Sequence, residues 1–233
     1  MRQHTSGSTG GLTPDEVTGW IEAALFVVAV SILNVLYAYA VAKGANVIVF
    51  VLYALIGASL AMLYTSGIGS DGWTIIKAPQ SWVYGSASVG LEAIYFLLVG
   101  LVSPAEASLT ARLSVPASLL IGWAFFSSHV SLRQAVGGVI VVAAVVPVLL
   151  WVPAQHRAVA ILLGILCALA VAIKTFASEF HPWNRAASNV IEKIRVTGLV
   201  VLATTALALA VTGLAMLAAA AGNSAAKAFA PPL

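Results

Sequence analysis

Charged residues are scarce in this 233-residue chain: Asp, Glu, Lys and Arg together make up 8%, whereas 61% of the residues are hydrophobic. A soluble domain carries about 25% charged residues, which keep its surface hydrated. The shortage excludes an ordinary soluble fold and predicts an all-α, polytopic membrane protein embedded in a lipid bilayer. The net charge of +3 does not indicate a nucleic-acid partner, because basic residues in membrane proteins mainly mark the cytoplasmic side.

Residue patterns for cofactor and metal chemistry are also missing. The single cysteine, Cys167, allows neither a disulfide framework nor a zinc cluster. No His or acidic pair has the helical spacing of metal ligands, and no nucleophile–base pair or phosphate-binding glycine loop is evident. The last hydrophobic stretch, residues 196–220, contains no Lys, which excludes the Schiff base of a retinal protein. We therefore expect no enzyme activity, no cofactor and no metal.

Long hydrophobic stretches dominate what is present. A helix needs about 20 apolar residues to cross the hydrocarbon core. On that basis the chain has seven predicted spans, at residues 20–42, 46–66, 82–102, 107–127, 134–152, 157–178 and 196–220. Both ends of the chain, residues 1–18 and 222–233, are expected to be disordered tails. The first of these has no basic segment before a short apolar core, so it does not predict a cleavable signal peptide.

The basic residues predict the orientation of the spans. With the N-terminus in the cytoplasm, seven of the eleven Lys and Arg residues lie on the cytoplasmic side. The connection between the last two spans contributes most to this bias. We therefore predict a multi-pass protein of a cell inner membrane with a cytoplasmic N-terminus and an external C-terminus. Within that connection, segment 179–195 is either an amphipathic helix on the membrane surface or a plain basic loop.

A family resemblance lies in the fourth and fifth stretches. Pro116 lies inside a span, Ser131 and Gln134 form a short polar turn before the next span, and Gly137 opens that span. This pattern resembles the end of an EamA-like repeat of the drug/metabolite transporter superfamily. The glutamate usual in that turn is missing, and Ser128 stands about where it would be. Independently of the resemblance, a proline inside a helix removes a backbone hydrogen bond and kinks the helix.

The resemblance implies ten spans in two five-helix repeats of opposite orientation. Residues 19–152 would then form one complete repeat, and residues 153–221 would supply two further helices with a basic cytoplasmic loop. Three helices of the second repeat are absent. The expected function is movement of a small organic metabolite or drug-like solute. The alternative is a non-transporting membrane subunit or assembly factor that retains part of a transporter fold.

Glu92 is the leading candidate for the solute pathway, because it lies about midway along the third stretch. An ionisable group at that depth costs roughly 2.5–3.5 kcal/mol on insertion scales, so it usually faces the bundle interior. If transport is proton-coupled, Glu92 is the group expected to carry the proton. Arg112 lies at comparable depth in the fourth stretch and could pair with Glu92. Such a pair would either belong to the pathway or simply hold the fold together.

Further pathway candidates are Asn34 and Tyr37, which lie one helical turn apart on the first span, together with Tyr95 and Pro116. Asn34 and Tyr37 would offer hydrogen bonds to a solute, or alternatively to a neighbouring helix. Polar groups left uncovered by the missing helices predict a partner, either a homodimer or another membrane subunit. Faces rich in small residues are the expected contact surfaces, around Gly85, Gly90, Gly198 and Gly213.

Overall fold

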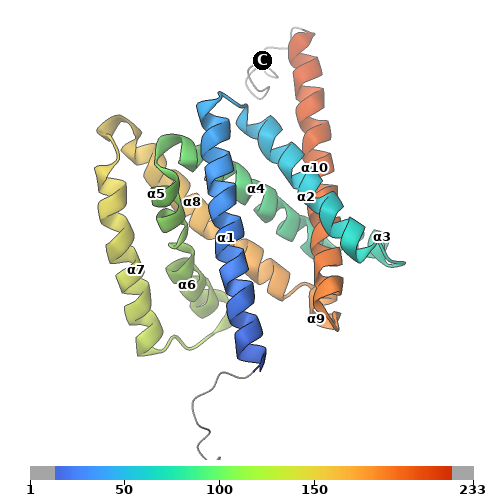
Figure 1. Ribbon diagram of the computed structural model, residues 1–233, viewed down its shortest axis with the longest axis horizontal. Coiled ribbons are helices and arrows are strands. Elements are labelled where there is room, and N and C mark those ends of the chain that lie inside the picture. The colour runs from blue at the N-terminus through green and yellow to red at the C-terminus, as the bar shows by residue number, and fades with distance from the viewer. Residues whose placement is uncertain (1–13, 222–233) are drawn as a thin grey trace, which may run out of the picture.

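The computed structural model describes residues 14–221, which fold into helices joined by short connections (Figure 1). The longer helices are α1 (Pro14–Ala42), α2 (Val47–Ser66), α4 (Pro79–Leu101), α5 (Pro104–Ala111), α6 (Ser114–Phe126), α7 (Leu132–Trp151), α8 (Ala154–Glu179) and α10 (Val190–Ala220). Two short helices, α3 (Gly72–Lys77) and α9 (Pro182–Ala186), lie in connections. Residues 1–13 and 222–233 of the two predicted tails lie outside the described residues, whereas residues 14–18 belong to α1 and not to a disordered tail.

Six of these segments are long and apolar enough to cross a membrane, when α5 and α6 are taken together as one span. The apolar part of α1, Val27–Ala42, supplies a shorter seventh. Successive connections alternate between the two ends of the bundle (Figure 1). The predicted all-α, polytopic bundle of about seven spans is therefore confirmed, and the predicted spans match the helices to within a few residues at most ends.

Local side-chain caps explain where several helices begin. The side-chain oxygen of Asn46 accepts hydrogen bonds from the backbone N–H groups of Ile48 and Val49, which starts α2. Ser131 and Gln134 form a reciprocal capping box at the start of α7. Such caps satisfy backbone donors that have no partner within the helix. Ser131 and Gln134, which carry much of the EamA-like pattern, thus have a local role in helix capping.

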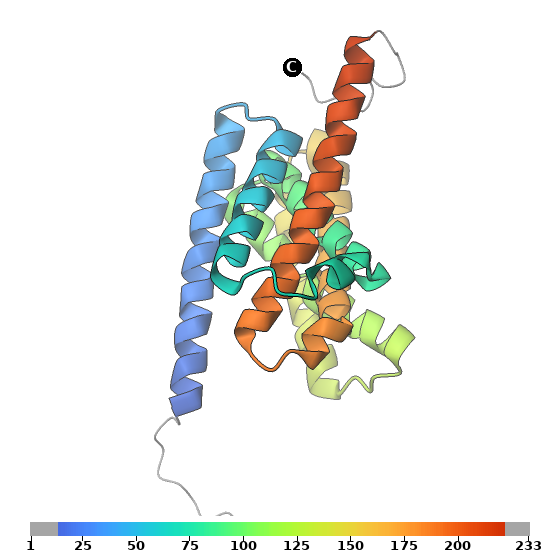
Figure 2. The same cartoon turned by 90° about the vertical axis from the view of Figure 1, so that its right-hand side faces the viewer.

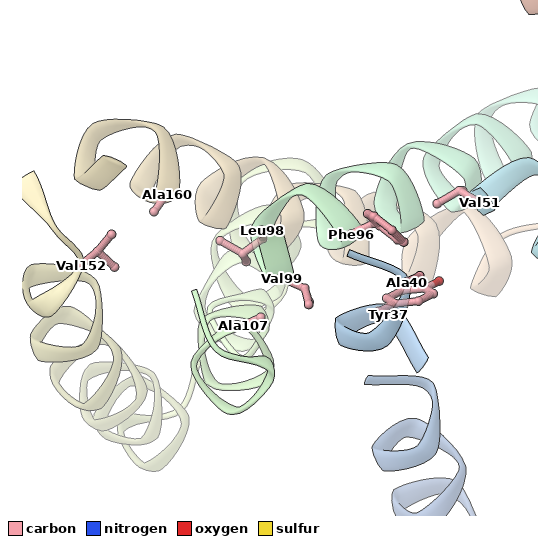
Figure 3. Packing of buried hydrophobic residues seen from close by; sticks show 9 residues of the cluster. All are labelled: Tyr37, Ala40, Val51, Phe96, Leu98, Val99, Ala107, Val152 and Ala160. Atoms are coloured by element: carbon pink, nitrogen blue, oxygen red, sulfur yellow. The ribbon is translucent and has the colours of Figure 1, made fainter. Parts of the chain in front are cut away.

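Two helices, α4 and α8, run obliquely through the middle of the bundle and pack along each other (Figure 1). The other close partnership joins α10 to α2 and α4, and Figure 2 shows α10 upright beside α2. One hydrophobic cluster contains Tyr37 of α1, Phe96 of α4 and Ala160 of α8, together with residues of α2, α5 and the α7–α8 connection (Figure 3). The sixth span, α8, therefore shares this core with earlier spans, and α10 shares a second cluster with α3 and α4.

Two of the glycines predicted to face a partner are used inside the protomer. A Cβ on Gly85 would overlap with Oγ1 of Thr204 and lie 3.1 Å from the carbonyl oxygen of Val200. A Cβ on Gly198 would lie 3.1 Å from side-chain atoms of α2. These glycines let α10 approach α4 and α2, as small residues do between membrane helices. The prediction that Gly85 and Gly198 form a dimer face was wrong for that reason.

Candidate functional site: the Glu92 cavity between α1, α4, α5, α6 and α8

Two hydrogen bonds join α1 to α4 inside the bundle. The phenolic hydroxyl of Tyr37 donates to Oε2 of Glu92 at 2.5 Å, and that of Tyr95 donates to Oδ1 of Asn34 at 2.8 Å. Each helix contributes two residues three positions apart, which is the spacing that places side chains on one helical face. Four of the six predicted pathway residues thus form one polar cluster.

The cluster is held rigidly on its α1 side. Tyr37 is 2% exposed and Asn34 is 9% exposed, whereas Glu92 and Tyr95 are half-buried. The ring of Tyr37 packs against Phe96, with centroids 5.3 Å apart, and edge-on against Phe50 at 5.8 Å. The ring of Tyr37 is therefore fixed by apolar packing, while its hydroxyl donates a hydrogen bond to the carboxylate of Glu92. Glu92 lies close to the middle of α4, as its place in the sequence predicted.

Glu92 and Tyr95 line a cavity of about 410 Å³. The same cavity is lined by Arg112, by Lys174 and by Cys167 on α8. One carboxylate and two cations therefore line a common cavity between the helices. No ion pair joins Glu92 to Arg112 or to Lys174 in the part of the chain that the structure describes. Arg112 shares the cavity of Glu92, as predicted, but the two side chains are not bonded to each other.

The span that carries Arg112 is interrupted beside this cavity. Helix α5 ends at Ala111 and α6 begins at Ser114, and the chain between them forms a tighter turn. There the N–H of Leu113 donates to the carbonyl of Thr110 at 3.0 Å, and that of Val115 donates to the carbonyl of Arg112 at 2.9 Å. Both are bonds to the third preceding residue, the pattern of a 3₁₀ turn.

Pro116 is the cause of the interruption. In a continuous α-helix, the N–H of residue 116 would bond to the carbonyl of Arg112, four residues earlier, and proline has no N–H to donate. Pro116 itself does not line the Glu92 cavity, contrary to its prediction as a pathway residue. It lines a separate apolar groove between α6 and α7 with Trp123 and Gly138. Its effect on the site is exerted through the backbone at Arg112.

Lys174 was missed as a site residue, because its position near the end of a span suggested that it would reach the membrane surface. The structure places it in two cavities at once. With its neighbour Thr175 it lines the Glu92 cavity and also a second polar cavity, of about 520 Å³, towards α9 and the start of α10. No local sequence signal indicates this placement, because it depends on how α8 packs against its neighbours.

His181 lies in the connection between α8 and α9. Its side chain is fully buried, and Nε2 lies 2.9 Å from Oγ of Ser81 at the start of α4. Burial lowers the pKa of His181 below its usual value. The histidine fastens the α8–α9 connection to α4, beside the second polar cavity.

Comparisons with known protein families, with curated proteins and with solved structures each gave no match to this chain. The resemblance to EamA-like repeats therefore rests on the sequence pattern around Pro116 and Gly137, and it stays a prediction. Within residues 14–221, no group of three or more His, Cys, Asp or Glu side chains is placed to hold a metal ion.

Proposed function

We propose that this membrane protein moves a small organic solute across a bacterial-type inner membrane through the cavity that holds Glu92. The observation that carries the proposal is the meeting, in one cavity of about 410 Å³, of Glu92, Arg112 and Lys174 beside an interrupted span. Membrane transporters build solute sites near the bilayer midplane from discontinuous helices, whose free backbone groups and polar side chains address the solute.

Each group in the cavity has a role under this proposal. Arg112 and Lys174 attract an anionic group of the solute, because hydrogen bonds from cations to carboxylate or phosphate are stronger than those between neutral groups. Glu92 receives a cationic group or a proton, and its bond from Tyr37 holds the carboxylate in place. The carboxylate can then change its protonation or its partner while Tyr37 stays fixed in its apolar packing.

Transport can be tested with the purified full-length chain in proteoliposomes loaded with a defined mixture of small metabolites. Mass spectrometry measures which solutes leave, with and without an imposed pH gradient. We expect selective efflux that Glu92→Gln lowers at least tenfold, because the amide keeps the shape and accepts the bond from Tyr37 but carries no charge. Asp71→Asn is the matched control, since Asp71 is an exposed acid outside the cavity that makes no helix-capping bond.

Two results would overturn the proposal. Efflux no faster than from protein-free liposomes, for every solute in the mixture, would favour a non-transporting membrane subunit. Normal efflux by Glu92→Gln would remove the carboxylate from the pathway even if transport occurs.

A further inference from the structure

The second polar cavity, which we name the vestibule, lies between α4, α8, α9 and α10. Three cations from three different elements line it: Lys174 from α8, Arg185 from α9 and Lys193 from α10. Glu179 is the one carboxylate among its lining residues. Its volume of about 520 Å³ lies within the range of about 300–1,000 Å³ that is usual for ligand pockets.

The protein offsets the positive charge of the vestibule only in part, through the single carboxylate of Glu179. Among the described residues, none of Lys174, Arg185 and Lys193 forms an ion pair with a carboxylate. The nearby acid Glu192 is engaged elsewhere, because its carboxylate accepts a 2.7 Å bond from the N–H of Ser188 at the start of α10. Three cations around one cavity repel each other and create a field that concentrates anions. The arrangement is stabilised when a ligand supplies the missing negative charge.

The wall that presents Arg185 is fixed by specific contacts. Nδ2 of Asn184 donates to both the carbonyl oxygen and the hydroxyl of Ser178, each at 3.0 Å, which ties α9 to the end of α8. The guanidinium of Arg185 lies over the ring of Phe180, 5.9 Å from its centroid. His181, fully buried, anchors the same connection to Ser81. The cation is thus held in position before any ligand arrives, which lowers the entropic cost of binding.

We propose that the vestibule binds a phosphate group. A planar guanidinium and two ammonium groups converging on one space match the several oxygens and the double negative charge of phosphate. The vestibule lies where α8 ends and α10 begins, and basic pockets at such positions bind lipid headgroups. It also shares Lys174 and Thr175 with the Glu92 cavity, which offers a route for a free phosphorylated solute. The chemistry is the same for both sources, and experiment separates them.

The test compares two double variants of the full-length chain in detergent. Arg185→Gln with Lys193→Gln removes two vestibule cations and leaves Lys174, which belongs to the Glu92 cavity. Lys77→Gln with Arg133→Gln removes the same formal charge from α3 and α7, at positions that are exposed, as Arg185 and Lys193 are. Native mass spectrometry measures bound phosphatidylglycerol, with diacylglycerol as the lipid that lacks phosphate. Thermal unfolding measures the response to inorganic phosphate against sodium chloride at equal ionic strength.

We expect one phosphate-bearing ligand per chain, with affinity at least tenfold lower in the vestibule variant and changed less than twofold in the control. Retention of phosphatidylglycerol but not of diacylglycerol, lost in the vestibule variant, assigns the site to a lipid headgroup. Stabilisation by inorganic phosphate alone, lost in the same variant, assigns it to a free solute. Equal loss in both variants, or no response to either probe, overturns the proposal. Neither measurement depends on transport. The phosphate proposal can therefore be wrong while the proposed transport function is right, and transport can be absent while the vestibule binds phosphate.

Discussion

Oε2 of Glu92 accepts a hydrogen bond of 2.5 Å from the hydroxyl of Tyr37, a residue 55 positions away on another helix. Hydrogen bonds to an ionised carboxylate are stronger than those between neutral groups. The bond from Tyr37 leaves Oε1 of Glu92 without a hydrogen-bond partner among residues 14–221. Oε2 of the carboxylate therefore bonds to another helix of the fold, and Oε1 can contact a solute in the cavity. This division explains how one glutamate can be both a structural partner and a candidate for solute contact.

The Tyr37–Glu92 bond should contribute more stability than the neighbouring Tyr95–Asn34 bond. Hydrogen bonds between membrane helices average about 0.6 kcal/mol in double-mutant cycles, whereas bonds to charged groups contribute about 1.5–3 kcal/mol. A cycle of Tyr37→Phe and Glu92→Met should give a coupling energy of about 1–2 kcal/mol. The matched cycle of Tyr95→Phe and Asn34→Leu should give about 0.6 kcal/mol or less. Unfolding in mixed detergent micelles measures both, and equal coupling energies would show that Glu92 is uncharged in the folded protein.

Gly85→Ala should destabilise the bundle by about 1–3 kcal/mol, the usual cost of overpacking. The new methyl group would overlap with Thr204 and press against the backbone of Val200, so α10 would have to move away from α4. Gly90→Ala is the control on the same helix, because a Cβ there meets nothing within 4 Å. The unfolding midpoints of Gly85→Ala and Gly90→Ala measure this difference in stability. A Gly85→Ala protein as stable as the control would mean that the α4–α10 contact is looser than the structure shows.

The spans could be predicted from the sequence because hydrophobic length is a property of each segment alone. The same is true of the depth of Glu92 and of the shared face of Asn34 and Tyr37. The pairing of Tyr37 with Glu92 could not be predicted, because it depends on which helices are neighbours. An ion pair of Glu92 with Arg112 was the natural expectation from charge alone. The structure instead gives Glu92 a neutral donor and leaves Arg112 facing the cavity.

Two further residues show where sequence reasoning stopped. Lys174 is near enough to a helix end to suggest the membrane surface, and only the packing of α4, α8 and α10 places it between two cavities. Gly85 carries no sign of whether its neighbour belongs to the same chain or to another copy, so a dimer face was predicted where α10 lies. Both cases concern contacts between segments far apart in the sequence, which local patterns do not encode.

Buried His181 should make the protein less stable in mild acid. Its pKa is lowered in the folded state, so the unfolded chain, with the ordinary value of about 6.5, takes up the proton first. The contribution of neutral His181 is fully present above about pH 6.5 and is lost as the pH falls from there towards the lowered folded-state pKa. Unfolding measured from pH 8 to pH 5 should show a steeper loss for the wild type than for His181→Gln. Parallel pH profiles would contradict the prediction.

Pro116→Ala should join α5 and α6 into one continuous span, and this change should cost transport rather than stability. The new N–H of residue 116 can donate to the carbonyl of Arg112, and removal of a helix-interior proline relieves up to about 3 kcal/mol of strain and lost bonding. Hydrogen–deuterium exchange should therefore show stronger protection of the amides from 112 to 117. Arg112 would turn with its backbone, so any efflux that depends on Glu92 should fall as the protection rises.

Pro147→Ala is the matched control, because Pro147 lies inside the uninterrupted α7, away from the Glu92 cavity. If both variants kept full efflux while protection rose in Pro116→Ala, the interruption would be a packing feature with no part in moving the solute.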